Sequence, residues 1–146
     1  MTQVRVAEPA DAEAIGRLLH DFNSEFGDPS PGPVRLAERV RELMVTDEIT
    51  VLLAEDGVAV AYFRPSLWTD ELECYLAELY VVPGRRGQGL GRALLDAAVA
   101  LARDTGADYM CLATSEDDVA ARSLYESAGF SNRDDGSLML FYEREL

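Results

Sequence analysis

The chain has 146 residues, of which 48% are hydrophobic and 27% charged, so the sequence predicts one globular domain over residues 1–146. Its net charge of -14 at pH 7 argues against nucleic-acid binding, because a phosphate backbone would be repelled. No apolar run approaches the roughly 20 residues of a membrane helix and no secretion signal is recognised, so we expect a cytoplasmic protein without a membrane partner.

The cysteines and the single histidine predict no metal centre. Cys74 and Cys111 lie far apart in the sequence inside apolar runs, which favours free thiols over a structural disulfide. His20 lies among apolar residues of a predicted helix with no Cys or His near it, so we interpret it as structural.

The N-terminal third predicts one short strand and two helices. Val4 to Val6 alternates like a strand, and Glu8 to Asp11 supplies the proline and the acids of a helix start. A helical apolar face follows, made of Ile15, Leu18, Leu19, Phe22 and Phe26. Gly27 to Pro33 is predicted as a loop, and Val34 to Val45 as the second helix.

The middle of the chain predicts three strands. Thr50 to Ala54 and Val58 to Arg64 are rich in β-formers and meet around Asp56-Gly57, a pair typical of a hairpin turn. Leu72 to Val82 is a longer run that closes at Pro83-Gly84.

The remaining elements complete an α/β pattern. Helices are predicted from Gly89 to about Arg103 and from Asp117 to Ser127, and strands from Tyr109 to Thr114 and, after the Asp134-Asp135-Gly136 turn, from Ser137 to Arg144. The expected order is β-α-α-β-β-β-α-β-α-β-β. We therefore expect a mixed α/β fold in which a central mixed sheet is flanked by helices on both faces.

A glycine-rich stretch, Arg86 to Gly91, lies between an apolar strand and an apolar helix. Three glycines there allow backbone N–H groups to approach a phosphate at a helix N-terminus. From Arg85 to Arg92 there are three arginines and no acid, which also favours an anion. The spacing fits neither a Rossmann fingerprint nor a P-loop, and a helix start that binds nothing is the alternative.

These residues resemble the GNAT acetyltransferase superfamily, whose acetyl-CoA loop has Arg or Gln, two residues, Gly, one residue, and Gly or Ala. Arg86, Gly89 and Gly91 match it. Leu79 to Pro83 is similar to the family's central strand, and Ala121 to Phe130 to its late helix with a Tyr-Glu-x-x-Gly-Phe ending. One departure is Asp118, where many members carry Asn.

The resemblance implies acetyl-CoA as co-substrate and no metal. Backbone groups of Val81 and Val82 are expected to pair with its pantetheine arm, in a gap between diverging strands. Its pyrophosphate is expected to bind the loop and helix start formed by Arg86, Gly87, Gln88, Gly89, Leu90, Gly91 and Arg92.

The resemblance also implies a direct attack of a primary amine on the thioester. Tyr125 is the candidate acid for the departing thiolate, and Glu78, a carboxylate in an apolar strand, is the candidate base. Glu73 is a weaker candidate, and a water chain is the alternative base. A bulge in this strand, common in relatives, would change which side of the sheet each residue faces.

The acceptor is expected to be a small cationic amine, an aminoglycoside-like sugar or a protein N-terminus, because the chain is acidic. Phe22, Phe26 and the segment Arg64 to Trp68 are expected near it, although a Phe stripe at helical spacing is more typical of a core. A catalytically idle acetyl-CoA-sensing module is the alternative function. The final strands are a candidate homodimer surface.

Overall fold

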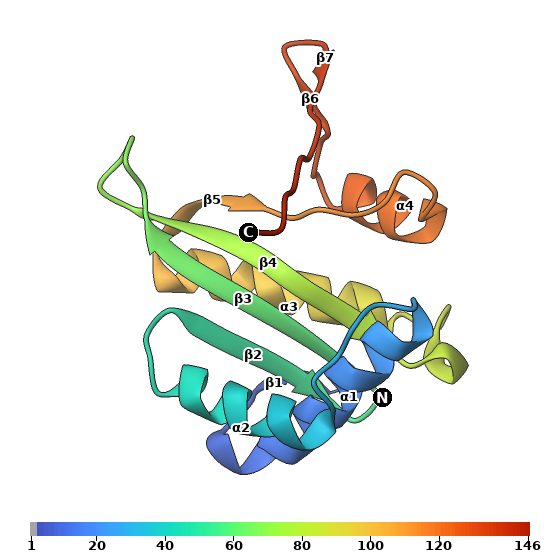
Figure 1. The fold of residues 1–146 in the computed structure, drawn as a ribbon. Coiled ribbons are helices and arrows are strands. Elements are labelled where there is room, and N and C mark those ends of the chain that lie inside the picture. Colours follow the sequence, from blue (N-terminus) through green and yellow to red (C-terminus); the bar gives the residue numbers. More distant parts are fainter. Residues whose placement is uncertain (1–2) are drawn as a thin grey trace. The chain divides into compact units, whose positions relative to one another are not determined.

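The computed structural model describes residues 3–146. The chain divides into two compact units, Met1–Leu112 and Ala113–Leu146, which are described separately below. The observed order of helices and strands agrees with the expected one (Figure 1). A single domain over residues 1–146 stays a prediction.

The first unit is built on a five-stranded mixed sheet. Its strands stand in chain order, and the ladder is antiparallel except for the parallel pair β4–β5. The strands are β1 (Arg5–Val6), β2 (Ile49–Ala54), β3 (Gly57–Pro65), β4 (Leu72–Val81) and β5 (Ala107–Cys111). The crossover between the parallel strands is the helix α3 (Leu90–Thr105), as a parallel connection requires. This confirms the predicted mixed sheet.

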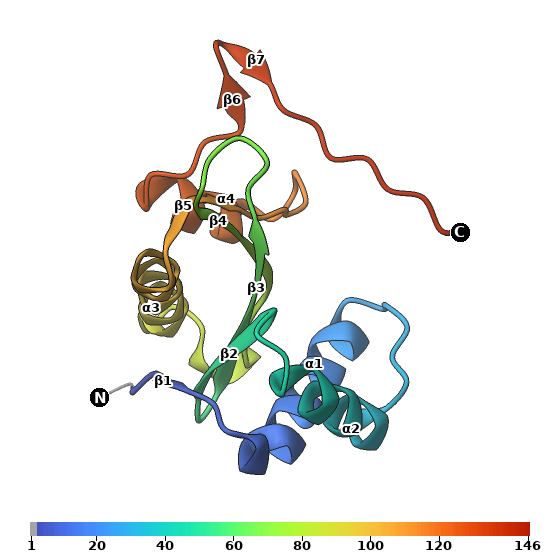
Figure 2. The ribbon, with the colours of Figure 1, turned by 90° about the vertical axis from the view of Figure 1, so that its left-hand side faces the viewer.

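Helices cover both faces of this sheet. Two helices, α1 (Ala12–Glu25) and α2 (Pro33–Met44), lie on one face and α3 on the other (Figure 2). Short 3-10 turns precede α1 and α3: η1 (Pro9–Asp11) and η2 (Pro83–Arg85). Each face has its own apolar core. Ile15, Val40, Val58, Val60 and Tyr80 are buried under α1 and α2, and Ala61, Phe63, Cys74 and Ala102 are buried under α3.

The β2–β3 hairpin is confirmed, but its glycine acts differently from the prediction. Ala54 pairs with Gly57, so the two turn residues are Glu55 and Asp56. Gly57 opens β3, and a Cβ at this position would lie 2.8 Å from Leu94 Cδ1. The glycine is therefore needed for the close packing of α3 on the sheet.

Gly16 sets the close approach of α1 and α2. A Cβ at Gly16 would lie 2.5 Å from the Pro33 carbonyl oxygen and 2.8 Å from the Ala37 amide nitrogen. We expect Gly16→Ala to lower the free energy of unfolding by about 1–3 kcal/mol, because backbone must move apart. Chemical denaturation measures it. Gly84→Ala is the control, since a Cβ at Gly84 meets nothing within 4 Å; equal stability of the two variants would contradict the packing role.

The second unit contains α4 (Val119–Ser127) and a small hairpin of β6 (Arg133–Asp134) and β7 (Ser137–Leu138). Asp118 is the N-cap of α4, and its Oδ1 accepts a hydrogen bond of 3.1 Å from the Ala121 amide. Helix capping therefore explains why an aspartate is suitable at this position, where many family members carry Asn. The predicted strand from Ser137 to Arg144 is too long: only β7 forms, because β6 offers only two residues for it to pair with.

Candidate functional site

The edge of β4 that follows the β5 ladder is open. The parallel pairing begins at Leu72 and Ala107 and ends at Tyr75 and Cys111, whereas β4 continues to Val81. Within the described part of the first unit, β4 therefore has no strand partner on the β5 side beyond Tyr75. Such an edge presents backbone donors and acceptors that an extended ligand can pair with.

The register shows which backbone groups face this edge. Val82 donates its N–H to the Asp56 carbonyl at 2.9 Å, and Gly57 pairs with Val81. In an antiparallel ladder the groups alternate, so Tyr80 and Val82 bond toward β3, whereas Leu79 and Val81 point their N–H and C=O to the open edge. The sequence prediction included Val81 and Val82 but missed Leu79, because alternation assigns a side only once the register is known.

A bulge in β4 decides which way Glu78 faces. Val60 pairs with Glu78 and Ala61 with Leu76, so Ala77 is an extra residue. Without it, Glu78 would share the α3 face with Cys74 and Leu76. With the bulge it stands opposite Val60, on the face covered by α1 and α2.

Glu78 is half-buried there. Burial raises the pKa of its carboxyl group above the ordinary value, and the negative charge of Asp28, in the loop after α1, raises it further. A carboxylate in this setting is a better proton acceptor near neutral pH than a solvated one. Glu73, by contrast, accepts a 2.8 Å hydrogen bond from Arg64 Nε at the far end of β4.

The glycine-rich loop connects β4 to α3 through two left-handed residues. Gly87 has φ +76° and Gly89 has φ +87°, a region that favours glycine. Gly89 is the N-cap of α3, and no side chain of the described residues caps it. The first N–H groups of α3, which have no partner within the helix, are thus directed to a site that suits an anion.

Arg85 and Arg86, at the start of this region, are both ion-paired. Arg85 pairs with Asp56 of the β2–β3 turn. Arg86 contacts both carboxylate oxygens of Glu25, each at 2.8 Å, and donates from Nε to the Val81 carbonyl at 3.0 Å. Acids from distant segments therefore balance the positive charges of Arg85 and Arg86.

Glu25 at the end of α1 joins this cluster to the sheet. Its carboxylate also accepts a 3.2 Å hydrogen bond from the Tyr80 hydroxyl, and the Arg86 guanidinium holds its pKa below the ordinary value. Phe22 stacks on the Tyr80 ring with centroids 4.9 Å apart, so Phe22 belongs to the core, while Phe26 is 54% exposed. The cluster fixes the end of α1 beside the start of the glycine-rich loop.

Tyr125 lies on α4 in the second unit, packed edge-on against Phe130 with centroids 6.2 Å apart. Burial raises the pKa of its hydroxyl, and the Asp118 carboxylate raises it further. A phenol in this state keeps its proton at neutral pH, as a proton donor must. The other predicted site residues all belong to the first unit.

The remaining sequence candidates have structural surroundings. His20 Nδ1 lies 2.8 Å from the Ser30 hydroxyl and so links α1 to the loop before α2. Cys74 and Cys111 are free thiols, and burial raises the pKa of Cys74 to about 11. Among residues 3–146, no three His, Cys, Asp or Glu side chains gather as metal ligands. The helices described here are too short or too polar for any of them to cross a bilayer.

Comparison with known proteins identifies the family of this chain. A family model described as the acetyltransferase (GNAT) family matches residues 13–130. The chain is 38% identical over 135 residues to a mycothiol acetyltransferase of Beutenbergia cavernae, covering 88% of this chain but 45% of that protein. It is 30% identical to an aminoglycoside N(6')-acetyltransferase type 1 of Stenotrophomonas maltophilia, covering 87% and 84% of the two chains.

A crystal structure of a candidate acetyltransferase from Arthrobacter sp. FB24 superposes with a TM-score of 0.92 at 43% identity, covering 100% of this chain and 97% of that one. The chain spans less than half the length of the mycothiol acetyltransferase, but most of the aminoglycoside enzyme and nearly all of the Arthrobacter protein. The family match covers both the β4–loop–α3 segment and α4. The chain therefore belongs to the acetyltransferase (GNAT) family, and the predicted enzyme class, an acetyltransferase, is confirmed at the level of that family.

Proposed function

We propose that this chain is an acetyl-CoA-dependent N-acetyltransferase that acts on a primary amine. The observation that carries the proposal is the open edge of β4 leading directly into the glycine loop at the start of α3. The open edge of β4 can pair with an extended chain that contains amides. The glycine loop at the start of α3 can bind phosphate. Acetyl-CoA contains both parts in that order.

On the donor side, backbone groups would make most of the contacts. The N–H and C=O groups of Leu79 and Val81 would pair with the pantetheine amides, and Arg86 would release the Val81 carbonyl when they do. Val82 already has partners in the chain, so we assign it a supporting role. The pyrophosphate would accept hydrogen bonds from the loop and helix-start amides of residues 86–92.

The reaction would proceed by direct transfer. Glu78, alone or through water, would accept the proton of the acceptor ammonium, and the free amine would attack the thioester carbonyl carbon. A backbone N–H of β4 would stabilise the oxyanion. As the C–S bond breaks, Tyr125 would give its proton to the thiolate, which would leave as CoA. The surplus proton on the attacking nitrogen would then pass through solvent and restore the Tyr125 hydroxyl.

The acceptor is proposed to be a small molecule that carries a positive charge. The chain's net charge of -14 favours a cation, and the relatives' names include an aminoglycoside acetyltransferase and a thialysine N-epsilon-acetyltransferase, the latter 33% identical over 73 residues. A protein N-terminus is the remaining candidate acceptor.

The test is calorimetric titration with acetyl-CoA beside ATP and NAD, followed by CoA release with a panel of amines. Selective binding of acetyl-CoA and release of CoA are expected. Failure to bind acetyl-CoA would overturn the proposal. Binding without transfer to any amine would instead favour a catalytically idle sensor, the second function that the cofactor surface alone allows.

Tyr125→Phe is expected to lower kcat by about 10- to 100-fold without weakening acetyl-CoA binding, because it removes only the proton donor. Steady-state kinetics and calorimetry measure the two effects. Phe130→Leu is the control for the contact between the Tyr125 and Phe130 rings and should reduce kcat less. An unchanged kcat in Tyr125→Phe would exclude the acid role.

A further inference from the structure

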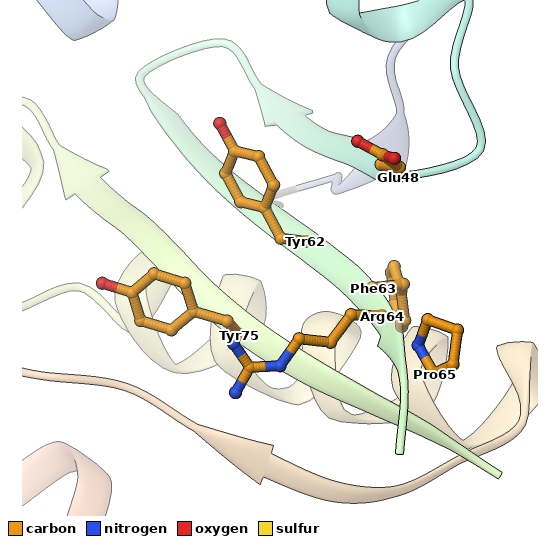
Figure 3. A pocket seen from close by; sticks show the side chains of 6 residues that line it. All are labelled: Glu48, Tyr62, Phe63, Arg64, Pro65 and Tyr75. Atoms are coloured by element: carbon orange, nitrogen blue, oxygen red, sulfur yellow. The ribbon is translucent and has the colours of Figure 1, made fainter. Parts of the chain in front are cut away.

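The two ends of β3 have different surroundings. At the Pro65 end lies an open pocket, lined by Glu48, Tyr62, Phe63, Arg64, Pro65 and Tyr75 (Figure 3). Neighbouring residues of a strand point to opposite faces, so this lining comes from both faces of the sheet. The glycine-rich loop follows the other end of the β3–β4 ladder, where Gly57 pairs with Val81. The part of the sheet next to the loop is therefore the β2–β3 turn, Glu55-Asp56, and not the pocket.

The β2–β3 turn contacts the connection from β4 to α3 at both of its ends. Where the connection begins, the Asp56 carbonyl accepts a 2.9 Å hydrogen bond from the Val82 amide. Where it ends, Leu90 is the first residue of α3 and is buried. A Cβ at Gly57 would lie 3.3 Å from Leu90 Cδ2, so the backbone that follows the turn packs closely against the first turn of α3.

The Asp56 side chain reaches the middle of the same connection through Arg85. Its Oδ2 accepts a hydrogen bond from Arg85 Nη1, in an ion pair whose two side chains are only partly exposed. Arg85 Nε donates to Gln88 Oε1 at 3.2 Å, and Gln88 Nε2 donates to the Gly84 carbonyl at 3.4 Å. These contacts join residues on both sides of Gly87, which has φ +76°.

The glycine-rich loop needs such contacts to keep one shape. Glycine has more backbone freedom than any other residue, and Gly87 and Gly89 both lie in this short segment. A ligand that had to order the loop would bind more weakly, because the cost of ordering reduces the affinity. A loop that is already held in the right shape avoids that cost.

We propose that Asp56 is a positioning residue for cofactor binding: through Arg85 it holds the glycine-rich loop in the shape that receives the pyrophosphate of acetyl-CoA. The inference rests on the function proposed above. It predicts an effect of opposite sign to that of simple electrostatics. Removing a carboxylate near an anionic ligand strengthens binding if only Coulomb forces act, whereas releasing the loop weakens it.

Calorimetric titration of the whole chain with CoA tests this sign. Asp56→Asn is expected to bind CoA about five-fold more weakly than the native protein, on the scale of a partly exposed ion pair. Glu55→Gln is the matched control and should bind CoA at least as tightly as the native protein. It removes the same charge from the adjacent turn residue, which is exposed and has no hydrogen bond or ion pair with any residue between 3 and 146. Equal affinity in the two variants would overturn the proposal.

A double-mutant cycle tests whether Asp56 acts through Arg85. In an Arg85→Gln background, Asp56→Asn is expected to change the CoA affinity by less than about two-fold, because the contact that it removes is already absent. A loss as large as in the native background would mean that Asp56 acts by another route, and the proposal would fail.

The order of the loop in the ligand-free protein separates this inference from the proposed function. The backbone amide order parameters of Gly87 to Gly91, measured by NMR, are expected to be lower in Asp56→Asn than in Glu55→Gln. If they are lower but the native protein does not bind CoA, Asp56 holds the loop and the proposed function fails. If the native protein binds CoA but the two variants have the same order parameters and the same CoA affinity, the function stands and the positioning role is refuted.

Discussion

Replacing Glu78 by glutamine is expected to lower kcat/KM for acetyl transfer by about 100-fold, the usual contribution of a general base. In the native enzyme the rate should fall as the pH decreases through the pKa of Glu78, because only the carboxylate accepts a proton. Burial raises that pKa above the ordinary value of a glutamate, so the acidic limb should lie at a higher pH than for a solvated glutamate. The variant should lose this limb, which a pH–rate profile measures.

Two controls distinguish this role from a structural one. Glu73→Gln removes a carboxylate from the same strand, and its pH profile should keep the acidic limb. A raised pKa in the folded state means that the folded protein holds more protons than the unfolded chain, so Glu78 makes stability fall as pH rises through that range. Glu78→Gln should therefore be at least as stable as the native protein at neutral pH. If a stable Glu78→Gln variant kept the pH–rate profile of the native protein, Glu78 would not be the base, and water would be the remaining candidate.

Gly89→Val is expected to weaken acetyl-CoA binding by about 100-fold or more, because several charge-assisted hydrogen bonds to phosphate would be lost together. Gly89 has φ +87°, which valine adopts only with strain. A Cβ there meets no protein atom within 4 Å, so the side chain would occupy the open space at the start of α3 where the phosphate is proposed to bind. Calorimetric titration with acetyl-CoA measures the loss.

A second substitution separates the phosphate site from loop strain. Asparagine tolerates the left-handed region better than other residues except glycine, so Gly89→Asn should keep the fold while its side chain still occupies the space proposed for the phosphate. Gly84→Val is the control in the same connection, where a Cβ meets nothing within 4 Å. Acetyl-CoA affinity equal to that of the native protein in a folded Gly89→Asn variant would place the pyrophosphate elsewhere.

Local patterns in the sequence were enough to predict the order of the helices and strands and the backbone shape of the glycine-rich loop. Helical spacing from Ile15 to Phe26 predicts α1 because that period places one apolar stripe on one face. The positive φ angles of Gly87 and Gly89 were also expected from the sequence, because glycine has no Cβ and adopts them without strain. The final strand was overestimated, because strand propensity after Ser137 does not supply the partner that a strand needs.

The orientation of the candidate base depended on a long-range feature. Alternation along β4 places Glu78 with Leu76, and only the extra residue Ala77 in the β3–β4 ladder turns it to the other face. The same register selects Leu79 and Val81 for the open edge. No pattern within β4 alone contains this information, because the offset is set by pairing with a different strand.

By itself, the sequence determined the order of elements, the anion-suited loop at Arg86 to Gly91 and the family resemblance, since these depend on residues close together in the chain. Only the tertiary structure decided that Arg86 is held by Glu25, 61 residues away. It likewise turned Glu78 to the face of the sheet that α1 and α2 cover. The physical reason is that both features depend on segments far apart in the sequence. An ion pair needs two opposite charges close in space, and the side of the sheet that a residue faces depends on how its strand pairs with another strand, so both are fixed only when the chain folds.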